Sequence, residues 1–228
     1  MKRTTSRWLG PAVAVWLACL ALVPAAPARA QRLPPLRRAD PFARALRTVP
    51  KFGFEDGPME WIVQKYKDSR ACVRVAHSQE QARSGKGSLE VVVDLVGGDA
   101  IKGKGEVWIN LKESAPKGVK TPVNLAGRTL SAWVFAPYGA RGDLDRPNGF
   151  QLFVKDAAWK SYYGSWKNVI EGQWVRLAIA PGRTAPEGGY ADRGFDPARI
   201  NAIGVKMGSG DGSRAKFEGS IYIDHVDW

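Results

Sequence analysis

The residues with the clearest chemical potential lie between 151 and 169, where large aromatic rings alternate with hydrogen-bonding groups. The stretch QLFVKDAAWKSYYGSWKNV carries five aromatic residues in nineteen positions, with Gln, Lys, Asp and Asn side chains among them. A flat, hydroxylated molecule has a face rich in C–H bonds and a rim of hydroxyl groups. Aromatic faces cover the first, and planar amides or charged groups hydrogen-bond the second. The composition is therefore typical of a surface that binds something flat and hydroxylated.

Alternation along the strand-like segments indicates which side chains leave the core, because successive residues of a strand point to opposite faces. In 106–111, 150–155 and 200–207, aliphatic residues of one parity predict a core face. In 162–169 the parity is less certain, because Gly164 can mark a bulge. If Val169 is core, Tyr162 and Trp166 face outward, and the direction of Tyr163 stays open. The candidate binding residues for such a flat, hydroxylated ligand are Trp108, Asn110, Gln151, Phe153, Lys155, Trp159, Tyr162, Trp166 and Lys206.

Each of these residues also has an ordinary structural interpretation. Buried Trp and Tyr side chains are common in β-sandwich cores, so any one ring could belong to the interior. Lys155 and Lys206 could equally be solvated surface lysines. Four further tryptophans are assigned to packing: Trp61, Trp133, Trp174 and Trp228. Of these, Trp133 could face either side of its strand.

The elements that must position these side chains are short strands. From residue 52 onward, runs rich in β-branched and aromatic residues alternate with Gly, Pro, Asn and Asp. No window in this region supports an amphipathic helix, and the one plausible helical turn is 196–200. Strands without a covering helix must bury their apolar faces against each other. The sequence therefore predicts an all-β fold, a jelly-roll β-sandwich of two antiparallel sheets. The predicted strands are 71–78, 88–95, 106–111, 129–135, 150–155, 162–169, 174–180, 200–207 and 220–228.

The first residues are typical of an export signal. Residues 1–30 combine a basic start, an apolar run broken by two prolines, and the small-x-small sequence that ends at Ala30, after which we expect cleavage. A Pro- and Arg-rich linker follows at 31–50, and the folded domain is expected at 51–228. We expect a secreted or periplasmic protein without a membrane anchor. Cys72 is then the only thiol, so no internal disulfide is possible.

The net charge of +12 does not indicate a nucleic-acid-binding surface. Residues 1–51 carry ten basic groups and one acid, so the rest of the chain is close to neutral. Binding to duplex nucleic acid needs cations concentrated where the phosphates lie. We therefore expect no nucleic-acid partner.

Several segments in order resemble a known group of domains: FGFEDG at 52–57, HSQEQARSGKGSLEVVVDL at 77–95, NLAGRTLSAWVFAP at 124–137, and FDPARINAIGVKMG followed by SIYIDHVDW. The sequence over 52–228 resembles the galactose-binding-like β-sandwich of carbohydrate-binding modules attached to bacterial mannanases, glucanases and xylanases. The resemblance implies a non-catalytic module that binds a polysaccharide or oligosaccharide, of β-mannan or β-glucan type, on a concave sheet or its loops. We expect it to act as a monomer.

The same resemblance implies a structural Ca²⁺. In the family, an acid of the first strand, a carbonyl from a glycine-containing loop and an Asp of the last strand meet at the ion. The matching positions here are Glu55, Lys86 and Asp224. Ca²⁺ takes about six to eight oxygen ligands, for which carboxylates and carbonyls are suited. Alternatively, Glu55 and Asp224 are edge carboxylates near basic side chains. The isolated His77 and His225 do not have the spacing of zinc ligands.

No catalytic motif is evident in the sequence. It lacks G-x-S-x-G, a phosphate-binding glycine loop and a Cys–His pair with a third member, and nothing in it pairs two carboxylates as glycoside hydrolysis requires. Two alternatives stay open. One is a carbohydrate-active hydrolase or lyase on a jelly roll, in which Tyr163 or Lys155 transfers protons. The other is a protein-interaction or assembly module of the same fold.

Overall fold

The computed structural model describes residues 49–228. The predicted signal peptide (1–30) and nearly all of the predicted linker (31–50) lie outside the described residues. No helix among residues 49–228 is both long enough and apolar enough to cross a bilayer. The longest strand, β12, has twelve residues, and the only α-helix in the described part of the chain has four.

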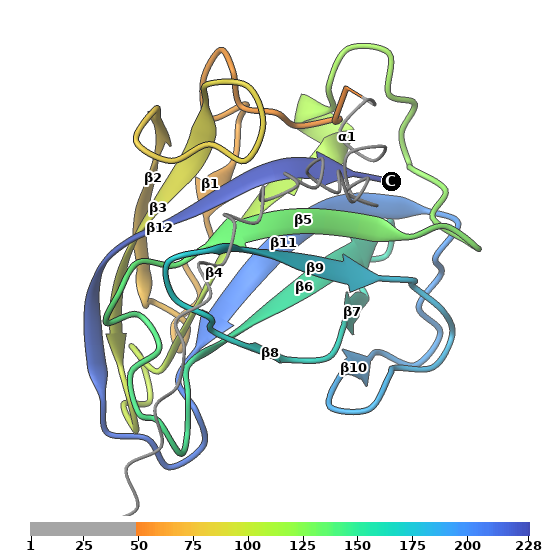
Figure 1. Ribbon diagram of the computed structural model, residues 1–228. Helices are drawn as coiled ribbons and strands as arrows, with labels where there is room; N and C mark the ends of the chain where they lie inside the picture. The colour runs from red at the N-terminus through yellow and green to blue at the C-terminus, as the bar shows by residue number, and fades with distance from the viewer. Residues whose placement is uncertain (1–48) are drawn as a thin grey trace, which may run out of the picture. The chain divides into compact units, whose positions relative to one another are not determined.

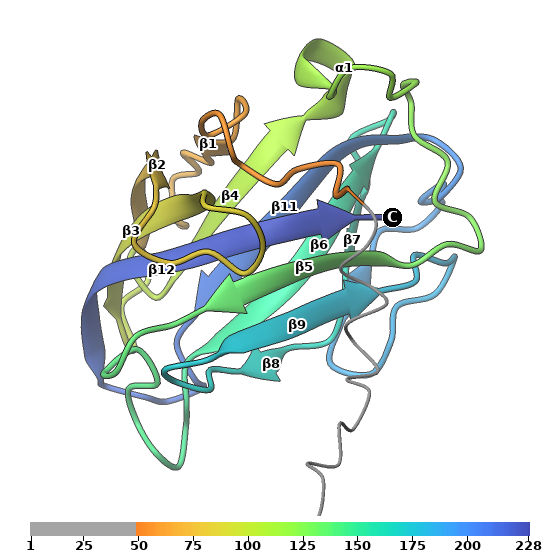
Figure 2. The ribbon, with the colours of Figure 1, turned by 45° about the horizontal axis from the view of Figure 1, so that its top comes forward.

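The described residues form a sandwich of two sheets whose named strands all pair antiparallel, which confirms the predicted fold class. Figures 1 and 2 show the sheet of β12, β5 and β9 lying over the sheet of β11 and β6. The five-stranded sheet has the order β2 (Cys72–Ser78), β3 (Ser88–Val96), β12 (Lys216–Asp227), β5 (Leu130–Phe135) and β9 (Trp174–Ile179).

The seven-stranded sheet carries the candidate site. Its path is β1 (Ile62–Val63), β4 (Lys104–Asn110), β11 (Ile200–Gly208), β6 (Gly149–Asp156), β7 (Ser161–Tyr163) and β10 (Tyr190–Ala191), and β8 (Lys167–Asn168) also pairs with β6.

The predicted strands agree with the observed ones to within a few residues, except at 162–169. This segment is two short strands, β7 and β8, separated by Gly164 to Trp166, which belong to no strand. The segment 196–200, expected as a helical turn, forms a non-helical turn. In it, the side chain of Asp196 accepts a hydrogen bond from the amide of Ala198 at 3.0 Å. The short helix α1 (Leu111–Ser114) was not predicted; Asn110 caps it.

The core lies between the sheets and follows the alternation of the strands. Val107 and Ile109 of β4, and Val205 and Met207 of β11, belong to it. At one end, Phe52, Phe54 and Trp61 pack together, with the ring centres of Phe52 and Trp61 5.7 Å apart. The assignment of Trp61 to packing is thus confirmed. Since one parity of β4, β6 and β11 fills the core, the other parity forms the opposite side of the seven-stranded sheet, which we call the outer face.

Candidate functional site

The outer face is organised by the register of its three central strands. Trp108 of β4 lies opposite Gly204 of β11, which lies opposite Phe153 of β6. Two residues along β11, Lys206 lies between Glu106 of β4 and Gln151 of β6. In antiparallel sheets, directly opposed residues share a face. The register therefore brings together side chains that are far apart in the sequence.

Two tryptophans form an edge-to-face pair at one end of the outer face. The ring centres of Trp108 and Trp159 are 5.6 Å apart with an interplanar angle of 75°. Trp159 is 48% exposed and comes from the turn between β6 and β7, with a φ of +61°. This left-handed conformation is unfavourable for a residue with a side chain. Asp156 holds the turn, since its Oδ1 accepts the amides of Ala158 at 2.8 Å and Lys160 at 2.9 Å.

A third tryptophan, Trp166, lies at the other end of the outer face and is 40% exposed. It packs on two glycines, because a Cβ at Gly208 would come within 2.8 Å of its ring and a Cβ at Gly149 within 3.1 Å. The Nζ of Lys206 lies 5.7 Å from its ring centre. Beside Trp166, a cavity is lined in part by Arg146 and Asp211. An accessible ring thus lies next to polar groups, as sugar binding requires.

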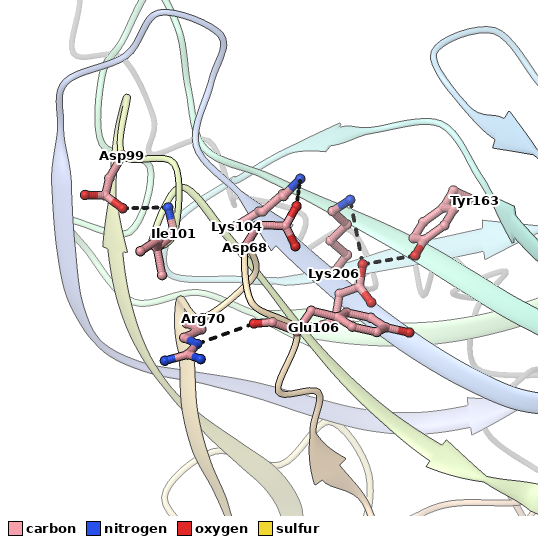
Figure 3. Close-up of polar contacts among 9 residues, drawn as sticks. Asp68, Arg70, Asp99, Ile101, Lys104, Glu106, Tyr163 and Lys206 are labelled. Carbon is pink, nitrogen blue, oxygen red and sulfur yellow. Dashed lines mark hydrogen bonds and ion pairs between the residues drawn. The ribbon is translucent and has the colours of Figure 1, made fainter.

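Between the two ends lies a buried polar cluster centred on Glu106 (Figure 3). Glu106 Oε1 accepts the hydroxyl of Tyr163 at 3.0 Å and lies 3.7 Å from Nζ of Lys206. The other oxygen, Oε2, is buried without a hydrogen-bond partner among the described residues. At the rim, Lys104 pairs with Asp68 at 3.7 Å.

Burial determines the protonation chemistry of this cluster. Burial, reinforced by the charge of Glu106 and by the hydrogen bond to it, raises the pKa of Tyr163. Tyr163 therefore stays a neutral hydrogen-bond donor. Burial also lowers the pKa of Lys206, although the charge of Glu106 opposes this shift. Because the phenol stays protonated, its burial and its hydrogen bond to Glu106 do not favour Tyr163 as the base of a lyase.

Lys155 occupies a second polar position, close to the tryptophan pair. Its side chain lies on the outer face, and the residue is 7% exposed. Nζ donates a hydrogen bond to the hydroxyl of Tyr66, which reaches the sheet from the segment between β1 and β2. The ammonium lies 4.9 Å from the ring centre of Tyr66, 5.9 Å from that of Phe153 and 6.0 Å from that of Trp108. It is enclosed by aromatic rings.

Other predicted site residues lie on the outer face but beneath its surface. Phe153 is fully buried: its ring covers Gly204 and stacks on Tyr163, with ring centres 5.0 Å apart. Gln151 is buried, and its Nε2 donates to the carbonyl oxygen of Gly164 at 2.7 Å. Their predicted parity is right, but in this structure these side chains support the outer face and other side chains cover them.

Two predicted residues have different positions from those expected. The outward direction predicted for Tyr162 is wrong: it lies opposite Val154 in β6 and belongs to the core. Its neighbour Tyr163, whose direction was left open, lies opposite Phe153 on the outer face. The side chain of Asn110 accepts the amide of Lys112 at 3.2 Å as the cap of α1.

Three residues of the site were not predicted. Glu106 has the same parity as Trp108, so alternation could have identified it. Gly204 has no side chain to suggest a role, and its importance follows only from its place between the rings of Trp108 and Phe153 in the sheet. Tyr66 lies in a segment with no periodic pattern, and only its contact with Lys155 reveals it.

The candidate calcium ligands converge on one loop. Glu55 Oε2 accepts the amide of Lys86 at 2.9 Å, and Asp224 Oδ2 accepts the amides of Arg83 and Ser84, both at 2.8 Å. Burial, and to a smaller extent Glu55, raises the pKa of Asp224 to about 6, whereas these amide hydrogen bonds lower it. Two carboxylates that repel each other beside one loop fit the chemistry of a cation site. However, within residues 49–228 no three His, Cys, Asp or Glu side chains cluster around a common point, so carbonyl oxygens would have to complete the ligand set.

Comparison with known proteins finds solved structures of similar fold and no match by sequence. No protein-family model matches the chain. No curated protein matches it. A carbohydrate-binding module, CBM27-1 of Caldicellulosiruptor saccharolyticus in complex with mannohexaose, has a TM-score of 0.51 and 16% identity; the match covers 77% of this chain and 93% of that one. This likeness agrees with the β-sandwich fold.

Two further structures have lower TM-scores. One comes from work on the promiscuous specificity of carbohydrate-binding modules of the β-sandwich superfamily, with a TM-score of 0.48 and 19% identity; the match covers 78% of this chain but only 61% of that one. The other is CBM28, a module specific for non-crystalline cellulose, with a TM-score of 0.43 and 12% identity; the match covers 79% of this chain and 94% of that one.

Proposed function

We propose that residues 51–228 form a non-catalytic carbohydrate-binding module that binds a polysaccharide along the outer face of the seven-stranded sheet. The observation that carries this proposal is the placement of accessible rings at both ends of that face, with buried polar groups between them. Trp108, which contacts Trp159, lies opposite Gly204, and Trp166 packs on Gly208. Four residues along a strand correspond to about 13 Å. This span is longer than one pyranose ring, so the ligand is a chain of sugars.

The chemistry of the face supports binding without catalysis. Rings at the ends can stack on sugar faces, and Lys206, paired with the buried Glu106, can hydrogen-bond hydroxyl groups. Glu106 is a single buried carboxylate, whereas glycoside hydrolysis typically uses two across a cleft. A linear glycan offers little apolar area, so we expect a Kd of about micromolar to millimolar, or about −8 to −4 kcal/mol.

Affinity electrophoresis combined with a reducing-sugar assay tests this function. The chain without residues 1–30 is run through gels that contain mannan, β-glucan or xylan, and the same polysaccharides are incubated with it in solution. We expect retardation by at least one polysaccharide and no release of reducing ends. Released reducing ends would indicate an enzyme, and migration unaffected by every polysaccharide would contradict the sugar-binding proposal.

The proposal also includes export by an N-terminal signal peptide and a monomeric state. The module is exported to the periplasm or the outside of the cell by residues 1–30, with Gln31 as the first residue of the mature chain. It works as a monomer, free of the membrane. N-terminal sequencing and the mass of the secreted protein in solution check these two points.

A structural Ca²⁺ belongs to the same proposal. Glu55 and Asp224, with the loop at Lys86, would hold the ion, which would neutralise the two carboxylates and fix the loop. Support comes from the approach of carboxylates separated by 168 intervening residues to one loop.

A further inference from the structure

We infer that the corner of the outer face formed by Lys155, Tyr66 and Trp108 binds a carboxylate, so that the ligand is a glycan containing acidic sugars. This inference rests on the proposed function and names the class of glycan. It concerns a buried ammonium that forms no ion pair among residues 49–228 and that Asp192 influences only from beyond ion-pair distance.

The first observation is the lack of a counter-charge. Lys155 is 93% buried, yet no Asp or Glu among residues 49–228 lies within ion-pair distance of its Nζ. By contrast, Lys206 on the same face has Glu106 at 3.7 Å. Removing an ammonium from water is costly unless it is paired and hydrogen-bonded. Aromatic rings compensate part of this cost through cation–π attraction, and they leave the net charge in place.

The second observation is a surplus of hydrogen-bond donors at the same corner. An ammonium has three N–H groups, and the structure gives Nζ of Lys155 one hydrogen-bond partner, the hydroxyl of Tyr66. The ring centre of Trp108 is 6.0 Å from this Nζ, and the buried indole Nε1 of Trp108 has no partner among the described residues. Lys and Trp side chains can only donate. The group that satisfies both is an acceptor, and a carboxylate has two acceptor oxygens and the missing charge.

Tyr66 occupies the position on Nζ of Lys155 that a sugar carboxylate would take. Tyr66 is 39% exposed, whereas Lys155, whose Nζ donates to the Tyr66 hydroxyl, is buried. Tyr66 belongs to a segment between two strands, whereas Lys155 lies within β6. A sugar carboxylate that takes the place of the phenol oxygen on Nζ would exchange a neutral hydrogen bond for a charge-assisted one. The exposed ring of Trp159, beside Trp108, would stack on the same sugar.

The test uses pairs of polymers that differ only in the acid group. Glucuronoxylan, polygalacturonate and alginate are each compared with their carboxyl-reduced forms, in which the acid has become a primary alcohol. Wild-type protein is expected to bind at least one acidic polymer about tenfold or more tightly than its reduced form, in line with the strength of a charge-assisted hydrogen bond. Dextran sulfate serves as a sugar polyanion without carboxylates and should bind more weakly.

Two lysine variants locate the effect. Lys155→Met keeps an apolar stem of similar length and should abolish the preference for the acidic form. Lys216→Met removes an exposed charge from β12 of the other sheet and should keep the preference. Because Lys155→Met also removes a buried unpaired charge, its melting temperature should equal or exceed that of the wild type, which shows that the variant is folded.

The outcomes separate this inference from the proposed function. Equal binding to acidic and reduced polymers would overturn the carboxylate site and leave the sugar-binding function standing. A preference for the acidic form that survives Lys155→Met, or equal binding to dextran sulfate, would assign the effect to general electrostatics and overturn the site. Absence of binding to every polymer, neutral or acidic, would overturn both.

Discussion

Trp159 lies edge to face against Trp108, and it does so from a backbone conformation that a tryptophan rarely adopts. The ring centres are 5.6 Å apart, and the φ of Trp159 is +61°. Strained residues of this kind persist where the surrounding structure holds them and occur frequently at binding sites. The contact connects the turn after β6 to β4.

Replacing Trp159 with glycine should separate binding from stability. Trp159→Gly removes an exposed ring and relieves a left-handed conformation that costs about 1–2 kcal/mol for a residue with a side chain. We expect glycan affinity to fall at least tenfold while the melting temperature stays the same or rises. Affinity electrophoresis and calorimetry on the same sample measure both. A melting temperature lower by many degrees would instead mark the ring as a structural element.

Gly204 should tolerate no side chain. A Cβ at this position would lie 2.3 Å from the ring of Phe153 and 2.6 Å from the carbonyl oxygen of Val107. Gly204→Ala should lower the free energy of unfolding by about 1–3 kcal/mol, the usual cost of overpacking. Gly182→Ala is the matched control, since its Cβ would meet only the carbonyl oxygen of Thr184 at 3.9 Å. Urea unfolding compares the two, and an equal effect of both substitutions would refute this role of Gly204.

Acid should weaken the edge of the seven-stranded sheet through Asp192. The amide of Ser161 donates to this carboxylate at 2.7 Å, and the hydroxyl of Tyr190 also donates to it; both hydrogen bonds lower the pKa of Asp192. Because the folded pKa lies below the unfolded value, the unfolded chain takes up the proton first as the pH falls.

The contribution of Asp192 to stability is therefore present above its unfolded pKa of about 4 and is lost as the pH falls through the lower folded value. Asp192→Asn should lose less stability than the wild type between pH 5 and pH 2, as chemical unfolding at each pH would measure. Parallel pH profiles of the two proteins would contradict the assignment.

A chelator should lower the melting temperature if Glu55 and Asp224 hold Ca²⁺. Removal of the ion leaves two carboxylates that repel each other beside one loop, so the free energy of unfolding should decrease. Readdition of Ca²⁺ should restore it. Glu55→Gln should make the protein insensitive to the chelator, whereas Glu187→Gln, at an exposed loop position, should not. A melting curve that the chelator leaves unchanged would mean that the loop amides alone stabilise these acids.

The fold was predictable because it depends on alternation. The parities of 106–111, 150–155 and 200–207 are observed as predicted, since a shift of one residue would turn the aliphatic set out of the core. The parity at Tyr162 was not predictable, because it depends on where β7 leaves the ladder at Gly164. The end of β7 is set by its pairing with β6, and this pairing cannot be read from the local sequence.

The depth of the site was less predictable than its location. Alternation places Phe153 and Gln151 on the outer face, but it does not reveal that the ring of Phe153 fills the space above Gly204. Nor does it indicate that Tyr66, from a segment without periodicity, contacts Lys155. Such contacts between distant segments depend on how the strands are arranged in three dimensions.

The most direct test of the central claim is a binding isotherm of Trp166→Ala for the polysaccharide that retards the wild type, measured together with its melting temperature. Tyr138→Ala, at a ring that is 84% exposed in the segment between β5 and β6, is the control. If the outer face binds glycan, Trp166→Ala loses at least tenfold in affinity and melts within a few degrees of the wild type, while Tyr138→Ala binds normally. Unchanged affinity of a folded Trp166→Ala would contradict the account.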